Sequence, residues 1–202
     1  MITVVNYGIG NIGSMLNMLK HLGLRGEVQS DPKIINNAKK IILPGVGSFD
    51  AAMTQINSVP NLRKTLEYKV IKEKVPILGV CLGMQLLTSN SEEGKQEGFG
   101  WIPAKTKRFP KQKKLKIPHM GWNIALPNEA SLLTKDLQDN PRYYFVHSFY
   151  VQVDDEKHSI MKTQYGITFD SAIGFENIYG VQFHPEKSHK FGMKILKNFS
   201  EI

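Results

Sequence analysis

Apolar positions in the first half of the chain follow two alternating patterns. Continuous apolar runs at 2–6, 40–44 and 75–80 are typical of buried strands, and a short strand is expected at 26–29. Between these runs, apolar side chains recur every three or four residues, as they do on one face of a helix. The helical positions are Ile12, Met15, Leu16, Leu19 and Leu22, then Phe49, Met53 and Ile56, then Leu62, Leu66 and Val70. This β-α alternation predicts a largely parallel sheet with helices on both faces.

The pattern changes after the polar segment 89–98. Period-two runs predict strands over 100–109, 122–126, 143–153, 167–175 and 178–183, with a hairpin turn at Glu176-Asn177. A final helix carries an apolar stripe from Phe191 to Phe199, and Ser188 is its candidate N-cap. Parallel units followed by antiparallel strands predict a single α/β domain over residues 1–202, built on a mixed sheet.

The composition agrees with a single domain and indicates where in the cell the protein is expected. The 202 residues are 41% apolar, enough for a substantial core. No apolar run reaches the roughly 18 residues that a membrane span requires. The chain starts directly with a strand and shows no secretory signal, and a single cysteine cannot form an internal disulfide. We therefore expect a cytoplasmic protein without a membrane partner.

The formal net charge of +8 has a local origin, since seven basic residues fall between Lys105 and Lys116. A basic patch is the first requirement of nucleic-acid binding. These lysines, however, lack interleaved aromatic residues for base stacking, which favours a solvated loop or edge hairpin. We expect no nucleic-acid partner. An acidic protein surface or a phosphorylated substrate nearby is a third explanation of the charge.

The only cysteine, Cys81, follows an apolar strand, precedes an expected helix at Leu82, and lies between Gly79 and Gly83. Small neighbours on both sides allow the sharp strand-to-helix turn known from nucleophile elbows. A thiol at a helix start is favoured as the thiolate, the attacking form. The Leu82 amide would point to the same place and could stabilise an oxyanion. A buried structural cysteine is the alternative, but it does not explain the paired glycines.

A base and an acid occur together at the end of another expected strand. His184 and Glu186 are two residues apart, so in extended chain both side chains point to one side and the carboxylate can fix the imidazole tautomer. The turn Pro44–Gly47 after the strand at 40–44 could present a second oxyanion donor, from Val46 or Gly47. A Cys-His-Glu hydrolytic site is predicted.

A different class of protein is suggested by Gly8, Gly10 and Gly13. Their spacing fits the dinucleotide-binding fingerprint, and Asp31 lies near the distance of a ribose-binding carboxylate. Glycines in this position can also serve close helix-sheet packing. A dehydrogenase would leave Cys81, His184 and Glu186 without a role, so we disfavour it.

The chain resembles class I, triad-type glutamine amidotransferases, and among them the glutaminase subunits of imidazole glycerol phosphate synthase, over nearly its full length. The motifs that carry the resemblance are Asn6-Tyr-Gly-Ile-Gly-Asn11, Leu43-Pro-Gly-Val-Gly47, Gly79-Val-Cys-Leu-Gly-Met-Gln-Leu-Leu87, Ser91-Glu-Glu-Gly94, Pro118-His-Met-Gly-Trp-Asn123, Tyr144-Phe-Val-His-Ser148 and Gly180-Val-Gln-Phe-His-Pro-Glu-Lys-Ser188. The resemblance implies a three-layer, flavodoxin-like α/β fold with a mainly parallel sheet and an antiparallel C-terminal portion.

The resemblance also implies roles for individual residues, without a cofactor or metal. Cys81 would attack the side-chain amide of L-glutamine, with His184 as proton carrier oriented by Glu186. The glutamine head group would be bound by Gln85, Glu93 and the backbone of Ser148 and Phe149. Ammonia would pass to a (β/α)₈ cyclase subunit in a heterodimer of histidine biosynthesis. The residues expected to face that subunit are Asn11, Trp122, Asn123, Tyr144 and Lys187.

Several functions share these motifs. A paralogous glutaminase could supply ammonia to a cyclase-like synthase that aminates a nucleotide sugar for a surface glycan. A γ-glutamyl hydrolase could use a similar elbow, although Met120–Asn123 argues against it. A non-catalytic scaffold would be expected to lack the nucleophile or the base, and this chain has Cys81, His184 and Glu186.

Overall fold

The structure, a computed structural model, describes residues 1–111 and 115–202. Its strands are β1 Ile2–Val5, β2 Gly26–Gln29, β3 Ile41–Gly45, β4 Ile77–Cys81, β5 Ala104–Arg108, β6 His119–Ile124, β7 Leu126–Pro127, β8 Arg142–His147, β9 Phe149–Val153, β10 Ser159–Tyr165, β11 Ile167–Phe175 and β12 Ile178–Val181. Its α-helices are α1 Ile12–His21, α2 Pro32–Ile35, α3 Phe49–Ser58, α4 Leu62–Glu67, α5 Leu82–Leu86 and α6 His189–Glu201.

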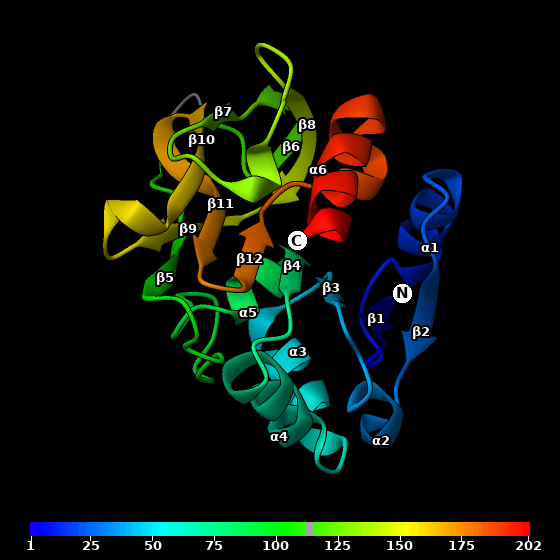
Figure 1. The fold of residues 1–202 in the computed structure, drawn as a ribbon. Coiled ribbons are helices and arrows are strands. Elements are labelled where there is room, and N and C mark those ends of the chain that lie inside the picture. The colour runs from blue at the N-terminus through cyan, green and yellow to red at the C-terminus, as the bar shows by residue number, and fades with distance from the viewer. Residues whose placement is uncertain (112–114) are drawn as a thin grey trace.

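The main sheet joins a parallel half to an antiparallel half (Figure 1). Strands β2, β1, β3, β4 and β12 lie side by side and all run parallel. From β12 onward, β11, β10 and β7 follow in antiparallel order, and β9 with β5 pairs on the other side of β11. The mixed, mainly parallel sheet and its flavodoxin-like start, β2-β1-β3-β4, are as predicted.

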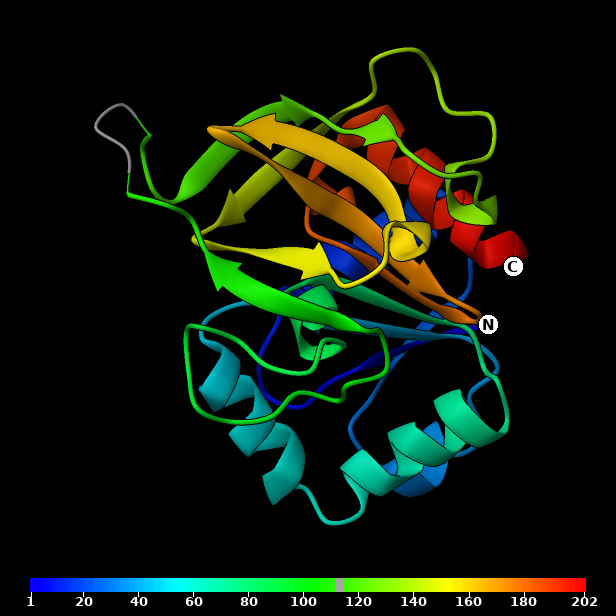
Figure 2. The ribbon, with the colours of Figure 1, turned by 90° about the vertical axis from the view of Figure 1, so that its left-hand side faces the viewer.

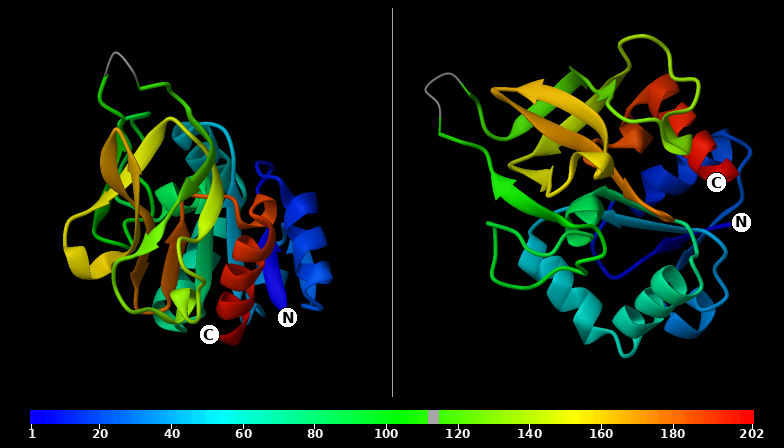
Figure 3. Two further views of the ribbon diagram at one scale, coloured as in Figure 1. Left: turned by 90° about the horizontal axis from the view of Figure 1, so that it is seen from above. Right: turned by 60° about the vertical axis from the view of Figure 1, so that its left-hand side comes forward.

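Two apolar layers cover the sheet, because neighbouring residues of a buried strand point to opposite faces. Ile41 and Leu43 of β3 belong to the core that contains α3 and α4, whereas Ile42 belongs to the core that contains α1 and α6. Figure 2 shows the sheet between α3 and α4 below and α6 above. Figure 3 shows the protein from above, with α6 in front of the strands, and obliquely, with the sheet again between the two helical layers. The protein therefore has three layers, with α3 and α4 on one face of the sheet and α1 and α6 on the other.

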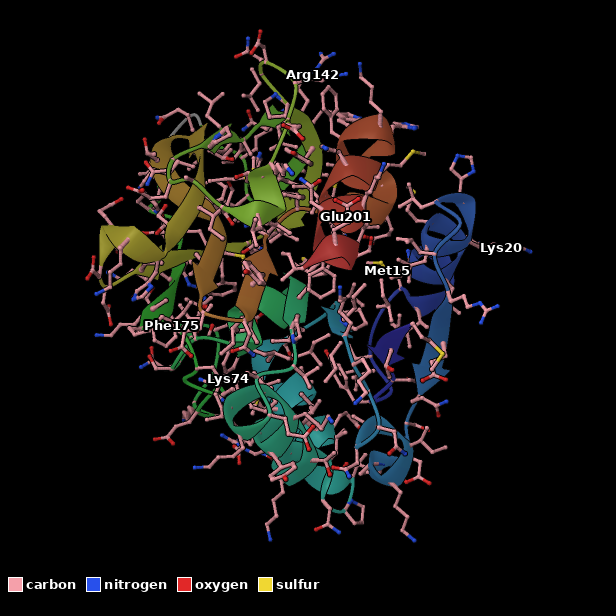
Figure 4. The ribbon with its side chains drawn as sticks, in the orientation of Figure 1. Met15, Lys20, Lys74, Arg142, Phe175 and Glu201 are labelled. Atoms are coloured by element: carbon pink, nitrogen blue, oxygen red, sulfur yellow. The ribbon has the colours of Figure 1, made fainter. Side chains whose placement is uncertain are left out.

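Helix α1 shows how its sequence pattern places it on the sheet. Met15 is buried and points from α1 toward α6, while Lys20 points away from the protein (Figure 4). The apolar stripe predicted from the spacing of Met15 and Leu19 is therefore the packed face of the helix.

Two of the expected strands are divided in the structure. The stretch 143–153 forms β8 and β9, separated at Ser148, and these strands belong to different sheets. Buried and more accessible residues alternate without a break through Ser148, so the period gives no sign of the division. The stretch 122–126 is likewise split between β6 and β7 at Ala125. Strand β10 and helix α2 have no counterpart in the sequence-based prediction.

Other local expectations have mixed outcomes. The hairpin turn at Glu176-Asn177 is confirmed, with Phe175 opposite Ile178. Ser188 is the N-cap residue of α6, as predicted, but its side chain makes no capping hydrogen bond. Its hydroxyl donates to the His184 carbonyl at 2.6 Å and accepts from the Tyr144 N–H at 3.0 Å, so it braces the segment before α6 instead of capping the helix. Part of the basic stretch 105–116 lies outside the described residues; its beginning forms the strand β5.

Candidate active site

Cys81 sits at a strained turn between β4 and α5. Its φ of 55° and ψ of −109° are unfavourable for a residue with a Cβ, and such conformations persist only where the surrounding structure imposes them. A Cβ at Gly79 would lie 2.5 Å from the Gly83 carbonyl oxygen, and one at Gly83 would lie 1.8 Å from the Leu43 oxygen. Both flanking glycines are therefore required by close backbone packing, as the elbow interpretation predicts.

Sheet register brings the distant histidine to this turn. Strand β12 lies parallel to β4, with Val181 opposite Val80. Cys81 is the last residue of β4, and His184 comes three residues after Val181, so both lie at the same edge of the sheet. The carboxyl ends of parallel strands are where α/β proteins build their sites. Cys81 and His184 line one pocket.

The imidazole of His184 is held from one side only. Its Nδ1 lies 2.8 Å from Oε1 of Glu186, and both side chains are buried. Its Nε2 has no hydrogen-bonding partner among the described residues. The His184 N–H donates to the Tyr144 carbonyl at 2.9 Å, which fixes the backbone. One ring nitrogen is thus bound to an acid, and the other is free to exchange a proton.

Electrostatics favour a charged His184. Burial by itself lowers the pKa of this imidazole, but the sulfur of Cys81 and the carboxylate of Glu186 outweigh it and raise the pKa to about 10. The sulfur and the imidazole line the same pocket, so the two groups are neighbours. Proton transfer from the thiol to His184 is the chemistry that such a pair supports.

The pocket around Cys81 has a volume of about 290 Å³, at the small end of the range for ligand sites. It is lined by Val46, Gly47, Cys81, Leu82, Gln85, Glu93, Pro118, Val146, His147, Ser148, Phe149 and His184. Every residue predicted to form the oxyanion hole or to bind glutamine is in this lining. These residues come from seven separate stretches of chain.

The expected oxyanion donors flank the sulfur. Gly45, at the end of β3, is paired with Cys81, which brings Val46 and Gly47 to the pocket rim. Leu82 begins α5, where backbone N–H groups have no partner within the helix. The hydroxyl of Tyr7 donates to the Pro44 carbonyl at 2.7 Å and ties this turn to the end of β1.

Two acceptors in the pocket are anchored by other contacts. Glu93 Oε2 accepts the N–H of Phe49 at 2.8 Å, at the start of α3. Gln85 Nε2 donates to the carbonyl of Phe149 at 3.2 Å and to Oε1 of Gln182 at 3.1 Å. With both amide hydrogens of Gln85 engaged, its Oε1 is the atom left for a ligand, and it can only accept.

The Phe149 carbonyl is unavailable to a ligand, since it also accepts from Nδ1 of His147 at 2.7 Å. This fixes the tautomer of His147, whose Nε2 lies 2.9 Å from Nδ1 of His119. Burial lowers the pKa of His147 to about 3 and that of His119 to about 4, so both rings are neutral. Sequence reasoning missed this pair, because its two members are 28 residues apart and neither has a neighbouring acid in the sequence.

The residues expected to meet a partner do not all lie together. Trp122 is 48% exposed, stacks on His189 and contacts Tyr144 edge-on, and Nζ of Lys187 lies 5.7 Å from the Tyr144 ring centre. Asn123 instead donates to the Gln164 carbonyl at 3.0 Å and approaches His119 Nε2 at 3.2 Å. Because neighbouring strand residues alternate in direction, the side chains of Asn123 and Trp122 point to opposite faces of β6.

Asn11 lies at a third place, immediately before α1, and is partly exposed. Of the glycines before it, Gly10 fits the packing explanation. A Cβ at Gly10 would lie 3.3 Å from the Pro44 side chain, so this glycine serves close packing. Asp31 caps α2 by accepting the Lys33 N–H at 2.8 Å.

Residues 1–111 and 115–202 hold no group of three or more His, Cys, Asp or Glu side chains that could bind a metal ion. Of the helices described, none combines the length and apolar content needed to cross a membrane.

The fold and this pocket define a class. The sequence profile of the family described as glutamine amidotransferase class-I matches residues 3–202, and the chain belongs to that family. Two similar relatives carry names that are narrower than this family description. The chain is 51% identical to imidazole glycerol phosphate synthase subunit HisH 2 of Methanococcus maripaludis, covering 98% of both chains. It is 46% identical to the HisH subunit of Bdellovibrio bacteriovorus, covering both chains completely.

Solved structures share the fold at much lower identity. A protein described as a glutamine amidotransferase matches with a TM-score of 0.78 at 15% identity, covering 100% of this chain and 98% of the other. A glutamine amidotransferase from Thermotoga maritima matches with a TM-score of 0.64 at 15% identity, covering 99% of this chain and 82% of the other. These matches confirm the three-layer amidotransferase fold.

Proposed function

We propose that this chain, as a single amidotransferase domain over residues 1–202, is the glutaminase subunit of an imidazole glycerol phosphate synthase. It hydrolyses L-glutamine to glutamate and supplies the ammonia to a cyclase subunit. The observation that carries the proposal is the meeting of Cys81 and His184 in one small pocket beside a helix start. The names of the full-length relatives favour this synthase over a glycan-directed paralogue.

The first half-reaction forms a thioester. Nε2 of His184 takes the proton of Cys81, and the sulfur attacks the side-chain carbonyl carbon of glutamine. The negative charge that develops on the carbonyl oxygen is stabilised by the N–H of Leu82 and by an N–H of the Val46-Gly47 turn. When the tetrahedral intermediate collapses, the C–N bond breaks and His184 returns its proton to the departing ammonia.

In the second half-reaction, water is the nucleophile and the sulfur of Cys81 is the leaving group. His184 Nε2 removes a proton from a water molecule, whose oxygen attacks the thioester carbon. The same N–H groups stabilise the second oxyanion, the C–S bond breaks, and the thiolate of Cys81 is restored with glutamate as product. Throughout, Glu186 keeps Nδ1 of His184 protonated, so Nε2 always faces the reacting atoms.

Two acceptors in the pocket suit an amino acid head group. The carboxylate of Glu93 and the Oε1 of Gln85 are both acceptors, and both would bind the α-ammonium group of glutamine. The backbone of Ser148, at the interruption between β8 and β9, is the remaining polar contact. A free amino acid fits a pocket of about 290 Å³ better than a peptide would.

The partner surface lies next to this pocket. Met120, Trp122 and Ile124 alternate along β6 and are exposed at 62%, 48% and 38%. Met120 is paired with Val146, which lines the pocket. An apolar face that begins at the pocket edge is suited to a partner protein that receives the product. Together with Tyr144, Lys187 and Asn11, it would bind the cyclase and form a heterodimer.

The proposal is tested by measuring glutamate release from the purified chain alone, with the cognate cyclase, and with the cyclase plus its nucleotide ligand. We expect weak hydrolysis by the chain alone and a large increase in the full complex. The Cys81→Ser variant should bind the cyclase normally and release no glutamate. Glutamate release by that variant would refute the mechanism, and strong turnover that ignores the cyclase would refute the assigned partner.

A further inference from the structure

Gln182 is a buried polar residue directly behind the nucleophile. It follows β12 in the sequence, is fully buried, and its Nε2 lies 3.7 Å from the Cys81 sulfur. That distance suits a hydrogen bond to sulfur, which is larger than oxygen. The part of the pocket lining formed by the described residues does not include Gln182, so its amide serves the sulfur and not a ligand.

The direction of this hydrogen bond is fixed by a backbone group. The Phe149 carbonyl can only accept, so the atom of Gln85 that faces it must be Nε2. Gln85 Nε2 then donates to Gln182 as well, so the atom of Gln182 that faces Gln85 must be Oε1. The other end of the Gln182 amide, Nε2, is left to face Cys81. Reversing either amide would place two acceptors or two donors together.

The sulfur therefore has two polar neighbours, one that accepts a hydrogen bond from it and one that donates a hydrogen bond to it. The Val146 carbonyl lies 3.8 Å from Sγ and can accept only from a protonated thiol. Gln182 donates, and a donor interacts more strongly with an anion than with a neutral atom. Once Cys81 gives its proton to His184, the Val146 contact loses its hydrogen, whereas the Gln182 contact strengthens.

Other titratable groups face the sulfur as well. His184 is favoured in its charged form, because Cys81 and Glu186 raise its pKa. Tyr7 is held neutral, because burial and Cys81 both raise its pKa. His147 is neutral, and Glu93 in the pocket opposes a second negative charge. The Gln182 amide carries no charge at any of these pH values, so its donation to the sulfur does not depend on its own titration.

We propose that Gln182 is a positioning residue that holds the Cys81 sulfur toward the pocket and stabilises its thiolate through the Gln182 Nε2–Sγ hydrogen bond. The consequence for glutamine hydrolysis rests on the proposed function, but the contact itself can be measured without any turnover. Loss of the donor lowers the thiolate fraction near neutral pH and lets the sulfur rotate away from the attack direction.

The test is the pH dependence of Cys81 alkylation by iodoacetamide, which reacts with the thiolate. Two variants of similar size are compared. Gln182→Met removes the donor and the Gln85 contact. Gln182→Glu keeps an acceptor for Gln85 but turns a negative oxygen toward the sulfur. The exposed Gln152 on β9 provides the matched control, Gln152→Met. Because Cys81 is the only cysteine, the label reports on it alone.

We expect the alkylation midpoint to move up by about one pH unit in Gln182→Met, the size of a lost hydrogen bond to a charged group, and further in Gln182→Glu. Gln152→Met should match the unaltered protein. The value of kcat should fall about tenfold or more with little change in KM. A purely structural role would lower activity without moving the midpoint. Unchanged midpoints in folded Gln182 variants overturn the proposal.

A measurement on the unaltered protein covers the case in which both variants fail to fold. The side-chain amide proton resonances of Gln182 should shift with the same pH midpoint as Cys81 alkylation, and this shift should vanish in Cys81→Ser. Resonances that do not respond overturn the inference. If the unaltered protein shows no glutaminase activity in the complex, the proposed function fails separately, because neither measurement depends on it.

Discussion

Nδ1 of His184 lies 2.8 Å from Oε1 of Glu186, while the other oxygen of that carboxylate has no hydrogen-bonding partner within the described residues. Because this carboxylate is buried and makes one hydrogen bond, neither water nor other donors weaken its interaction with His184. This asymmetry makes Glu186 an effective stabiliser of the imidazolium that forms in each half-reaction. It also makes the contribution of Glu186 measurable.

Replacing Glu186 by Gln should lower kcat by about 10²-fold, the scale of one acid–base contribution. The pKa of His184 is raised by Cys81 and Glu186, so removing the carboxylate lowers it. The alkaline limb of the kcat profile, where His184 loses the proton needed by departing ammonia, should therefore move to lower pH. Steady-state assays of the complex from acidic to alkaline pH would show this. An unmoved limb would contradict the assigned role.

Cys81 and His184 should behave as one unit. Cys81→Ser and His184→Ala should each abolish nearly all turnover, and the double variant should be little worse than either single variant, because the base has no purpose without the nucleophile. Single-turnover measurements in the complex would compare the three. Additive losses in the double variant would mean that the two side chains act in separate steps.

Glu93→Gln should raise KM about 10- to 100-fold with little effect on stability, because a charge-assisted contact to the substrate is lost. A Gln at this position can still accept the Phe49 N–H at the start of α3, but it lacks the charge that attracts an ammonium group. Glu93→Ala removes both contacts and is expected to lower the unfolding temperature as well. Comparing KM and thermal unfolding of the two variants separates the roles. Equal KM values in the Gln variant and the unaltered protein would exclude Glu93 from substrate binding.

Trp122→Ala should weaken cyclase binding by about 30-fold, the loss of about 2 kcal/mol typical of an aromatic anchor. Tyr68→Ala is the matched control. Tyr68 has a similar exposure of 51%, but it follows α4, on the far side of the protein from β6 and β8 (Figure 1). Calorimetric titration with the cyclase would measure both. Equal affinities for the two variants would place the interface elsewhere.

The neutral His147 predicts a pH-dependent stability. Burial lowers its pKa to about 3, so between about pH 6.5 and pH 3 the unfolded chain takes up a proton that the folded chain does not. Stability therefore falls as pH falls, by about 1.4 kcal/mol per pH unit for this residue. His147→Gln keeps a donor for the Phe149 carbonyl and should show a shallower decline. Denaturant unfolding at neutral and mildly acidic pH would detect it, and parallel declines would show that His147 is not the cause.

The sequence was most informative where local chemistry is strict. Gly79 and Gly83 mark the elbow because any side chain at either position would collide with backbone, and the spacing of His184 and Glu186 suffices for their contact. It was least informative at Ser148, where the chain changes sheets without a break in the buried alternation. It also gave no sign of the hydrogen bond from Asn123 to the Gln164 carbonyl, because that contact depends on which face of β6 is covered.

The sequence by itself determined the residues with chemical capacity, the parallel first half of the sheet and the turn that exposes one sulfur, because steric demands and apolar periodicity act over a few neighbouring residues. Only the tertiary structure decided that His184 meets Cys81, that Gln182 stands behind the sulfur, and that two histidines form a neutral pair under the pocket. Those contacts depend on strand order and register, which arise from packing the whole sheet between two helical layers and leave no mark on any short stretch of sequence.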